Sequence, residues 1–128
     1  MIVYIESNFV LELTFEQEQA LSANNILALA ASKKIKLVFP SFVLSEPFEA
    51  VMRERRERND LYNGLVKTLK KLQRSEALRK EMLDLESAAG ILRDAYVRQI
   101  NLLHSTFDSL LNVGENVETN IVKFREAI

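Results

Sequence analysis

The stretch that decides the fold stands at the start of the chain, Ile2-Val3-Tyr4-Ile5-Glu6-Ser7-Asn8. Four apolar residues, rich in β-branched and aromatic types, are followed at once by an acid and two small polar residues. A short unbroken apolar run is typical of a strand that is buried on both faces, as in a parallel sheet. The pattern therefore predicts a strand over residues 2–5 that ends abruptly at Glu6.

The following residues complete a β-α-β unit. Residues 16–32 have a broad apolar face at helical spacing, formed by Ala20, Leu21, Ile26, Leu27, Leu29 and Ala30. Ile35 to Phe39 is a second short apolar run, and Pro40 stops it. This order predicts a right-handed crossover between two parallel strands.

After Pro40 the pattern is mostly helical. Either Ser41 or Ser45 can be the N-cap of the next helix, and only the Ser45 alternative places Pro47 in the first turn without a kink. Apolar residues then recur at helical spacing to residue 110, with a break expected near 74–76 or 82–84. Gly114 indicates a C-terminal stop. A weak third strand near 113–117 is an alternative, although Gly114 argues against it. Thr119 is the candidate cap of a last short helix over 120–128.

These elements predict a helix-dominated α/β fold. Two short parallel strands begin it, and a long antiparallel helical hairpin follows. A chain of 128 residues has the length of one domain, so we expect a single domain over 1–128. A sheet of two strands is small for a core, which favours either closure by the long helices or membership of a larger α/β unit.

Composition excludes several classes of protein. The chain has no Cys and one His, which excludes disulfide scaffolds, zinc fingers and thiol nucleophiles and argues against multi-His sites. No signal-peptide pattern or membrane-spanning run is present, so we expect a cytoplasmic protein without a membrane partner. The formal net charge is −1, which provides no overall basic field for nucleic acid.

The charge is unevenly distributed along the chain. Segment 53–80 contains ten Lys/Arg and four Asp/Glu, while the flanking residues are acidic. Arg53 and Arg56 are candidate substrate contacts. Together with Lys67, Lys70, Lys71 and Arg74 they form a face that fits RNA phosphates. The alternative is a solvated helix face with local ion pairs, which is the commoner role of mixed charge runs.

Two acids are the candidate catalytic and metal-binding residues. Glu6 follows the first strand, and Glu46 lies near the start of the helix after the second strand. Because the carboxyl ends of parallel strands meet at one edge, we expect both at the same crevice, where oxygen ligands suit a hard divalent cation. The simpler alternatives are a turn cap or Lys pair for Glu6 and a helix-dipole partner for Glu46. Ser7 and Asn8 are candidate substrate-binding residues, although Asn8 also fits a purely local backbone bond.

A family resemblance rests on two segments, Tyr4-Ile5-Glu6-Ser7-Asn8-Phe9-Val10-Leu11-Glu12-Leu13 and Lys36-Leu37-Val38-Phe39-Pro40-Ser41-Phe42-Val43-Leu44-Ser45-Glu46. They resemble the N-terminal part of a PIN-domain nuclease. The resemblance implies a metal-dependent ribonuclease in which several carboxylates gather around Mg²⁺ or Mn²⁺. It assigns Glu6 to the first acidic position and Glu46 to the second, with Ser7 and Asn8 at the polar positions beside the first acid.

The chain departs from the family pattern in two ways. The first acid is Glu6 where the family usually has Asp, and the later strand–helix unit with the remaining acids has no match before Ile128. Asp94, Asp108, Glu115 and Glu118 do not fit that unit. We therefore expect a PIN-like domain that is incomplete at its C-terminus, with weak metal binding and negligible catalysis by this chain alone.

Three functional hypotheses follow. The first is a PIN-like RNA nuclease, or the N-terminal fragment of one. The second is a non-catalytic helical interaction module that forms a homo-oligomer or binds a partner chain through an exposed apolar helical surface. The third is a basic RNA-binding adaptor.

Overall fold

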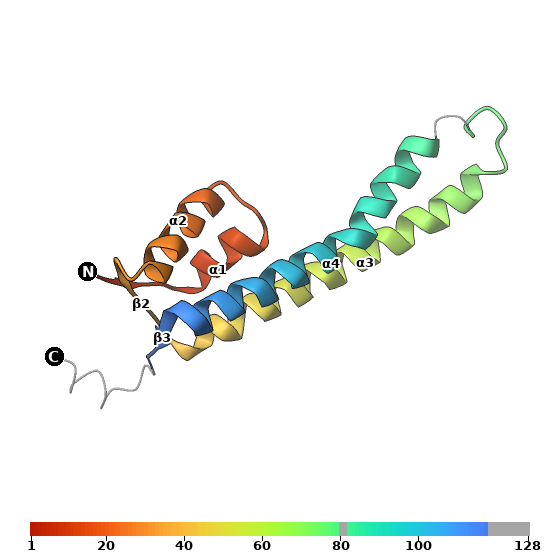
Figure 1. The fold of residues 1–128 in the computed structure, drawn as a ribbon. Coiled ribbons are helices and arrows are strands. Elements are labelled where there is room, and N and C mark those ends of the chain that lie inside the picture. The colour runs from red at the N-terminus through yellow and green to blue at the C-terminus, as the bar shows by residue number, and fades with distance from the viewer. Residues whose placement is uncertain (80–81, 118–128) are drawn as a thin grey trace. The chain divides into compact units, whose positions relative to one another are not determined.

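A computed structural model describes residues 1–79 and 82–117, with the backbone alone described at residues 83 and 84. The elements run in the order β1 (Ile2–Tyr4), α1 (Ser7–Thr14), α2 (Ala20–Ala31), β2 (Lys36–Phe39), η1 (Ser41–Leu44), α3 (Glu46–Leu72), α4 (Met82–Val113) and β3 (Gly114–Asn116) (Figure 1). The expected last helix over 120–128 lies outside the described residues. The helix-dominated α/β class is confirmed.

The chain divides into two compact units. One contains Met1–Glu49 with Gln99–Ile128, and the other is Ala50–Arg98. The first unit holds the sheet with α1, α2 and the C-terminal part of α4, whereas the second holds most of the helical hairpin. Among the described residues, no helix combines the length and the apolar character needed to cross a membrane.

The sheet has three parallel strands in the order β1-β2-β3. Ile2 pairs with Lys36 and Tyr4 with Val38, while on the other side of β2 the residue Leu37 pairs with Gly114. The predicted parallel β-α-β unit is therefore confirmed. The expected two-stranded sheet is wrong, because β3 follows α4 directly and adds a third strand.

Gly114 explains the third strand that the sequence argued against. A Cβ atom at this position would lie 2.8 Å from the carbonyl oxygen of Leu110 and 2.9 Å from the ring of Phe39. Gly114 does not have a positive φ, so close approach rather than an unusual backbone conformation favours glycine here. The residue interpreted as a helix stop is the one that lets α4 pass straight into a strand against β2.

One face of the sheet is covered and the other is open among the described residues. Leu37 and Phe39 point to the covered face and are fully buried. On β1, Ile2 and Tyr4 point to the opposite face and remain 67% and 49% exposed. The expectation that the first strand is buried on both faces is therefore wrong. Its physical reason is the strand order: both right-handed crossovers step in the same direction and place their helices over the same face.

The core of the first unit combines apolar side chains from distant parts of the sequence. Its fully buried members come from α1, β2, η1 and the last turns of α4, and are Val10, Leu37, Phe39, Val43, Leu103 and Leu110. Thr14 and Thr106 are also buried, and each hydroxyl donates to the carbonyl four residues earlier on its own helix, at 2.8 Å. These bonds satisfy polar groups that would otherwise destabilise the core.

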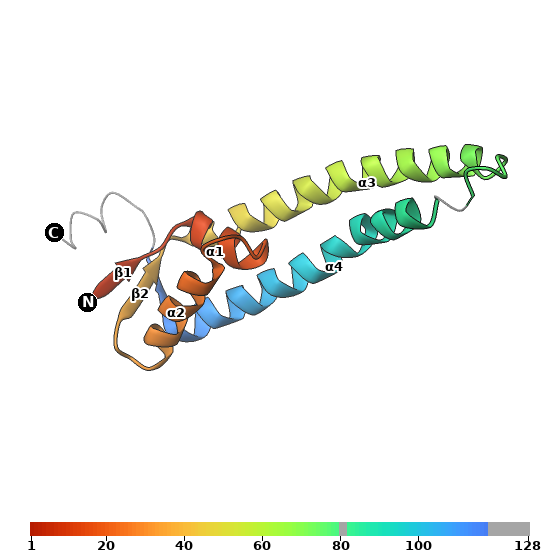
Figure 2. The same cartoon turned by 90° about the horizontal axis from the view of Figure 1, so that it is seen from above.

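The helices between β1 and β2 differ from the expected single helix over 16–32. Residues 7–14 form α1, and α2 begins only at Ala20 (Figure 2). The carboxylate of Glu12 accepts the backbone N–H of Gln19 at 2.9 Å, which stabilises the start of α2. Glu16 between them has a φ of 52°, a conformation that ends the first helix.

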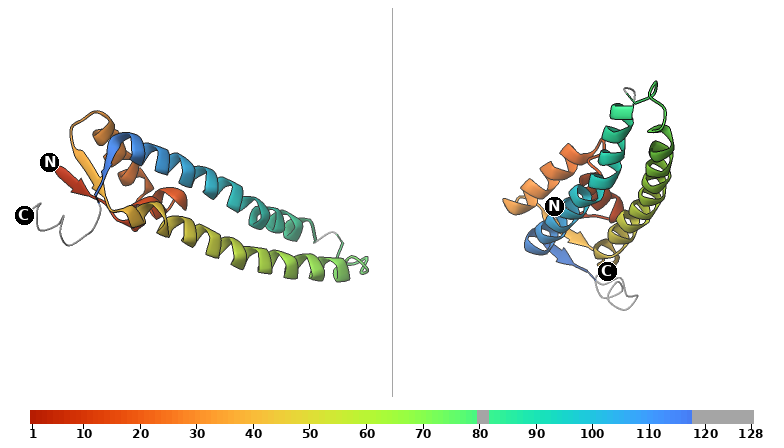
Figure 3. Two further views of the ribbon diagram at one scale, coloured as in Figure 1. Left: turned by 90° about the horizontal axis from the view of Figure 1, so that it is seen from below. Right: turned by 90° about the vertical axis from the view of Figure 1, so that its right-hand side faces the viewer.

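In the second unit, α3 and α4 lie side by side as an antiparallel hairpin (Figures 2 and 3). Their contacts include the guanidinium of Arg55, which lies 3.9 Å from the centre of the Tyr96 ring. The hydrogen bond and charge of the neighbouring Asp94 raise the pKa of Arg93 on α4, and Tyr62 on α3 adds a smaller contribution from across the hairpin. Helix α3 ends at Leu72, and the described residues 73–79 after it are not in an α-helix, so the first of the two expected break positions, 74–76, is confirmed.

Candidate functional site

The central contact of the candidate site joins the polar turn after β1 to the first residue of α3. The Ser7 hydroxyl donates to Glu46 Oε2 at 2.7 Å, across 39 positions of sequence. The chain turns from β1 into α1 at Ser7, while β2, η1 and Ser45 deliver Glu46 to the same place. The bond joins the residue after Glu6 to Glu46, whereas the convergence of the Glu6 and Glu46 carboxylates themselves stays a prediction. Because α3 begins at Glu46, Pro47 lies in its first turn, as the Ser45 alternative predicted.

Glu6 stands directly before this contact. It is the N-cap residue of α1, with extended backbone angles, and its side chain makes no cap hydrogen bond. The Glu6 carboxylate is exposed, and in the described part of the chain neither a hydrogen bond nor an ion pair holds it. Asn8 is likewise exposed, on the first turn of α1. The local alternatives considered for both residues, a Lys pair for Glu6 and a backbone bond for Asn8, do not occur among the described interactions.

The third strand adds a polar residue that the sequence did not reveal as part of this edge. The Ser41 hydroxyl, just past β2, donates to Asn116 Oδ1 at 3.2 Å. Asn116 pairs with Phe39, so it lies at the carboxyl end of β3 beside the carboxyl end of β2. A signal was present: a β-branched and polar run, Val113-Gly114-Glu115-Asn116-Val117, follows a long helix. Gly114 hid it.

Glu115 belongs to the open face of the sheet. Its carboxylate pairs with Lys36 at 2.8 Å, and both side chains are more than half exposed. An exposed pair of this kind contributes little to stability, about 0–1 kcal/mol. Glu115 therefore links β3 to β2 on the open face without adding much to their pairing. Glu118, the other late acid in this region, lies outside the described residues.

The donor set at the edge suits a hard cation. Glu46 and Glu6 offer carboxylate oxygens, and the oxygens of Ser7 and Asn116 are also present at the carboxyl ends of the strands. Mg²⁺ binds oxygen ligands and commonly retains several waters beside one or two carboxylates. Within residues 1–79 and 82–117, His, Cys, Asp and Glu side chains do not gather in any group of three or more that could hold a metal ion.

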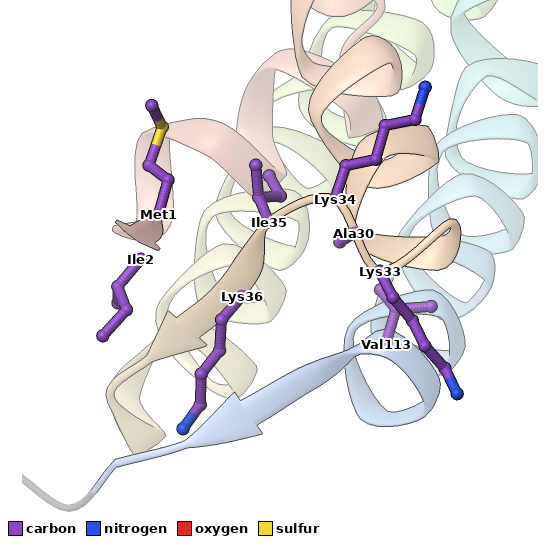
Figure 4. Close-up of a pocket in the computed structure, with 8 residues that line it drawn as sticks. All are labelled: Met1, Ile2, Ala30, Lys33, Lys34, Ile35, Lys36 and Val113. Atoms are coloured by element: carbon purple, nitrogen blue, oxygen red, sulfur yellow. The ribbon is translucent and has the colours of Figure 1, made fainter.

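A pocket of about 420 Å³ lies at the opposite edge, where β1 and β2 begin (Figure 4). Lys33, Lys34 and Lys36 line it together with Met1, Ile2 and Val113. The amino groups of Lys33 and Lys34 point away from each other (Figure 4), and Lys36 already pairs with Glu115. Because these cations do not converge, the pocket does not form a candidate anion site.

Arg53 and Arg56 belong to the second compact unit. Both are exposed on α3, four and seven residues after Glu49, the last residue of the N-terminal segment of the first unit. Their role as contacts for a substrate at the sheet edge stays a prediction.

Comparisons with known proteins did not identify a relative of this chain. Neither the family models, nor the curated proteins, nor the solved structures gave a match to this chain.

Proposed function

We propose that the polar edge around Ser7 and Glu46 binds Mg²⁺ or Mn²⁺ and belongs to a metal-dependent RNA nuclease of PIN-like type, or to the N-terminal part of one. The observation that supports this proposal most is the 2.7 Å bond from Ser7 to Glu46. It puts the carboxylate of α3 beside the turn that carries Glu6. Ligands of open α/β sheets lie beyond the carboxyl ends of the strands, usually where the strand order reverses. The order β1-β2-β3 has no such reversal among the described strands, so the position at the carboxyl ends is the part of that rule that supports the proposal.

Each residue has a defined part in this proposal. Ser7 orients Glu46 by donating to Oε2, which leaves the second carboxylate oxygen free to face a ligand. Glu6 supplies the other negative charge, and a cation between two carboxylates relieves their repulsion. A divalent cation, when bound, supplies the activation of water and the charge stabilisation that phosphodiester hydrolysis requires. With two carboxylates, the site binds a cation weakly, and we expect negligible cleavage by this chain alone.

Calorimetric titration of the 128-residue chain with Mn²⁺ tests the metal site. We expect a dissociation constant of about 0.1–1 mM, in the range of weak oxygen-ligand sites. Glu46→Gln is expected to reduce the affinity at least about tenfold, because it removes a ligand charge. Ser7→Ala is expected to reduce it up to about tenfold, by releasing the orientation of that ligand.

The matched control is Glu49→Gln, one helical turn along α3. It removes the same charge from the same helix, and Glu49 is exposed like Glu46. We expect it to leave the affinity within about twofold, since exposed charges beyond contact distance are screened by salt. Equal losses in the two variants, or an unchanged affinity in Glu46→Gln, would contradict the site.

The alternative function is a non-catalytic helical interaction module. The observation that favours it is the exposure of apolar side chains on the hairpin unit, where Ile91 is 71% exposed and Leu61 and Val97 more than half exposed. The measurement is the molar mass by light scattering at about 100 µM protein. The module hypothesis predicts at least twice the mass of one chain, and a return to the single mass in Ile91→Lys. A single mass in the unaltered chain would argue against self-association.

A further inference from the structure

The outer face of α3 carries a row of cations within the second compact unit. Five basic side chains recur at helical spacing and are all exposed: Arg53, Arg56, Lys67, Lys70 and Lys71. At 100° per residue they fall within about one third of the helix circumference. The buried positions Val51 and Leu69 lie on the other side of the helix. We call this row the basic stripe.

Most other cations of the unit that the structure describes have internal partners, whereas the side chains of the basic stripe do not. Arg55 lies over Tyr96, Arg79 donates to the carbonyl of Gln73 at 3.0 Å, and Arg93 pairs with Asp94 at 3.0 Å. For the side chains of the stripe, the described residues provide no hydrogen bond, ion pair or ring contact. Between Arg53 and Lys71, Asp60 lies within the arc of the stripe and Glu57 lies at its border.

The dimensions of the stripe suit an extended anion. From Arg53 to Lys71 the helix rises about 27 Å, at 1.5 Å per residue. Gly64 lies on the same side, and a Cβ built on it meets no atom within 4 Å. Glycine in a helix interior is less favourable than alanine. Neighbouring side chains do not require glycine here, whereas its small size lets an outside backbone approach the helix closely.

The chemistry of the face favours one class of partner. A helix that lies on an anionic membrane needs apolar side chains beside its cations. On α3, Leu69 is turned into the protein, and the exposed Leu61 falls outside the arc that the basic stripe occupies. A row of cations without apolar neighbours instead matches the regularly spaced charges of a nucleic-acid backbone, where phosphate contacts supply most sequence-independent affinity.

We propose that the basic stripe binds the phosphate backbone of a nucleic acid, without reading its sequence. This binding surface is separate from the sheet edge and does not depend on the nuclease proposal, because it needs neither a metal nor Glu46. It also applies if the chain binds nucleic acid without cleaving it.

The test is fluorescence anisotropy with the full chain, a labelled 20-nucleotide single-stranded RNA and 1 mM EDTA. EDTA removes divalent cations, so the sheet edge does not contribute. We expect salt-dependent binding. We expect Lys67→Gln/Lys71→Gln to weaken it about tenfold and to reduce the slope of log affinity against log salt by about 1.4, which is 0.7 for each lost contact.

The matched control is Lys33→Gln/Lys34→Gln, which removes the same two charges between α2 and β2. We expect it to change the affinity less than twofold, and DNA of the same sequence to bind within about threefold of RNA. Four results would overturn the proposal: no binding at 50 mM salt, equal losses in the two double variants, a preference for RNA over DNA above tenfold, or binding of phosphatidylserine vesicles in place of nucleic acid.

Discussion

Phe39→Ala is expected to lower the free energy of unfolding of the sheet unit by about 3–5 kcal/mol, the largest effect of any substitution considered for this protein. Phe39 is fully buried on the covered face of β2, the central strand. Its ring also contacts the α4–β3 junction at Gly114. Removing the ring leaves a cavity and takes away a surface against which β3 and the end of α4 pack.

The measurement is amide hydrogen exchange by mass spectrometry, because it reports on β2 separately from the helical hairpin. Peptides that cover β2 are expected to lose most of their protection in Phe39→Ala. The matched control is Phe48→Ala in α3, where the same side chain is removed from a position that is 41% exposed. In Phe48→Ala the free energy of unfolding is expected to fall by about 1 kcal/mol. Similar losses at both positions would show that the burial of Phe39 does not stabilise the sheet.

Gly114→Ala is expected to destabilise the same unit by about 1–3 kcal/mol, the usual range for overpacking a close-packed site. The added methyl group meets the Leu110 carbonyl oxygen at 2.8 Å and the Phe39 ring at 2.9 Å. The backbone oxygen cannot move away without distorting the last turn of α4. We therefore expect β3 to separate from β2, which would expose the Val117 N–H that now donates to the Phe39 carbonyl at 2.7 Å.

Loss of exchange protection in a peptide that contains Val117 is the direct readout. Gly64→Ala is the matched control, since a Cβ there meets nothing within 4 Å. That variant is expected to stabilise α3 by about 0.5–1 kcal/mol. The same substitution should thus have opposite signs at the two glycines. Destabilisation at both positions, or at neither, would contradict the close approach of Gly114 to Phe39.

The two substitutions are also expected to be coupled, because the residues are in contact. The double variant Phe39→Ala/Gly114→Ala removes one of the two clashes that the new methyl group causes. Its loss of stability should therefore be smaller than the sum of the single losses. Since β3 carries Asn116 to the carboxyl edge of the sheet, both substitutions are expected to disturb the candidate metal site as well.

Local patterns in the sequence were sufficient for much of the architecture. The apolar runs Ile2-Val3-Tyr4-Ile5 and Ile35 to Phe39 predicted β1 and β2, because short apolar β-branched runs bounded by polar or proline residues have few other structures. The strand–helix–strand order then fixed their parallel pairing. The long helices after Pro40 followed from apolar spacing alone, as did their antiparallel arrangement. For the site, the position of Glu46 at a helix start was also correct.

The tertiary structure decided what depends on distant neighbours. Gly114 resembles a helix stop when only nearby residues are considered, and it becomes a strand residue because the Phe39 ring, 75 positions away, occupies the space of its side chain. Asn116 lies at the carboxyl edge of the sheet for the same reason, because it belongs to the strand that Gly114 begins. Likewise, the sequence placed Glu6 and Glu46 at one edge but did not show that Ser7 holds Glu46. Spacing along the chain determines which elements form, whereas the choice of contacting atoms depends on packing between elements that the sequence leaves far apart.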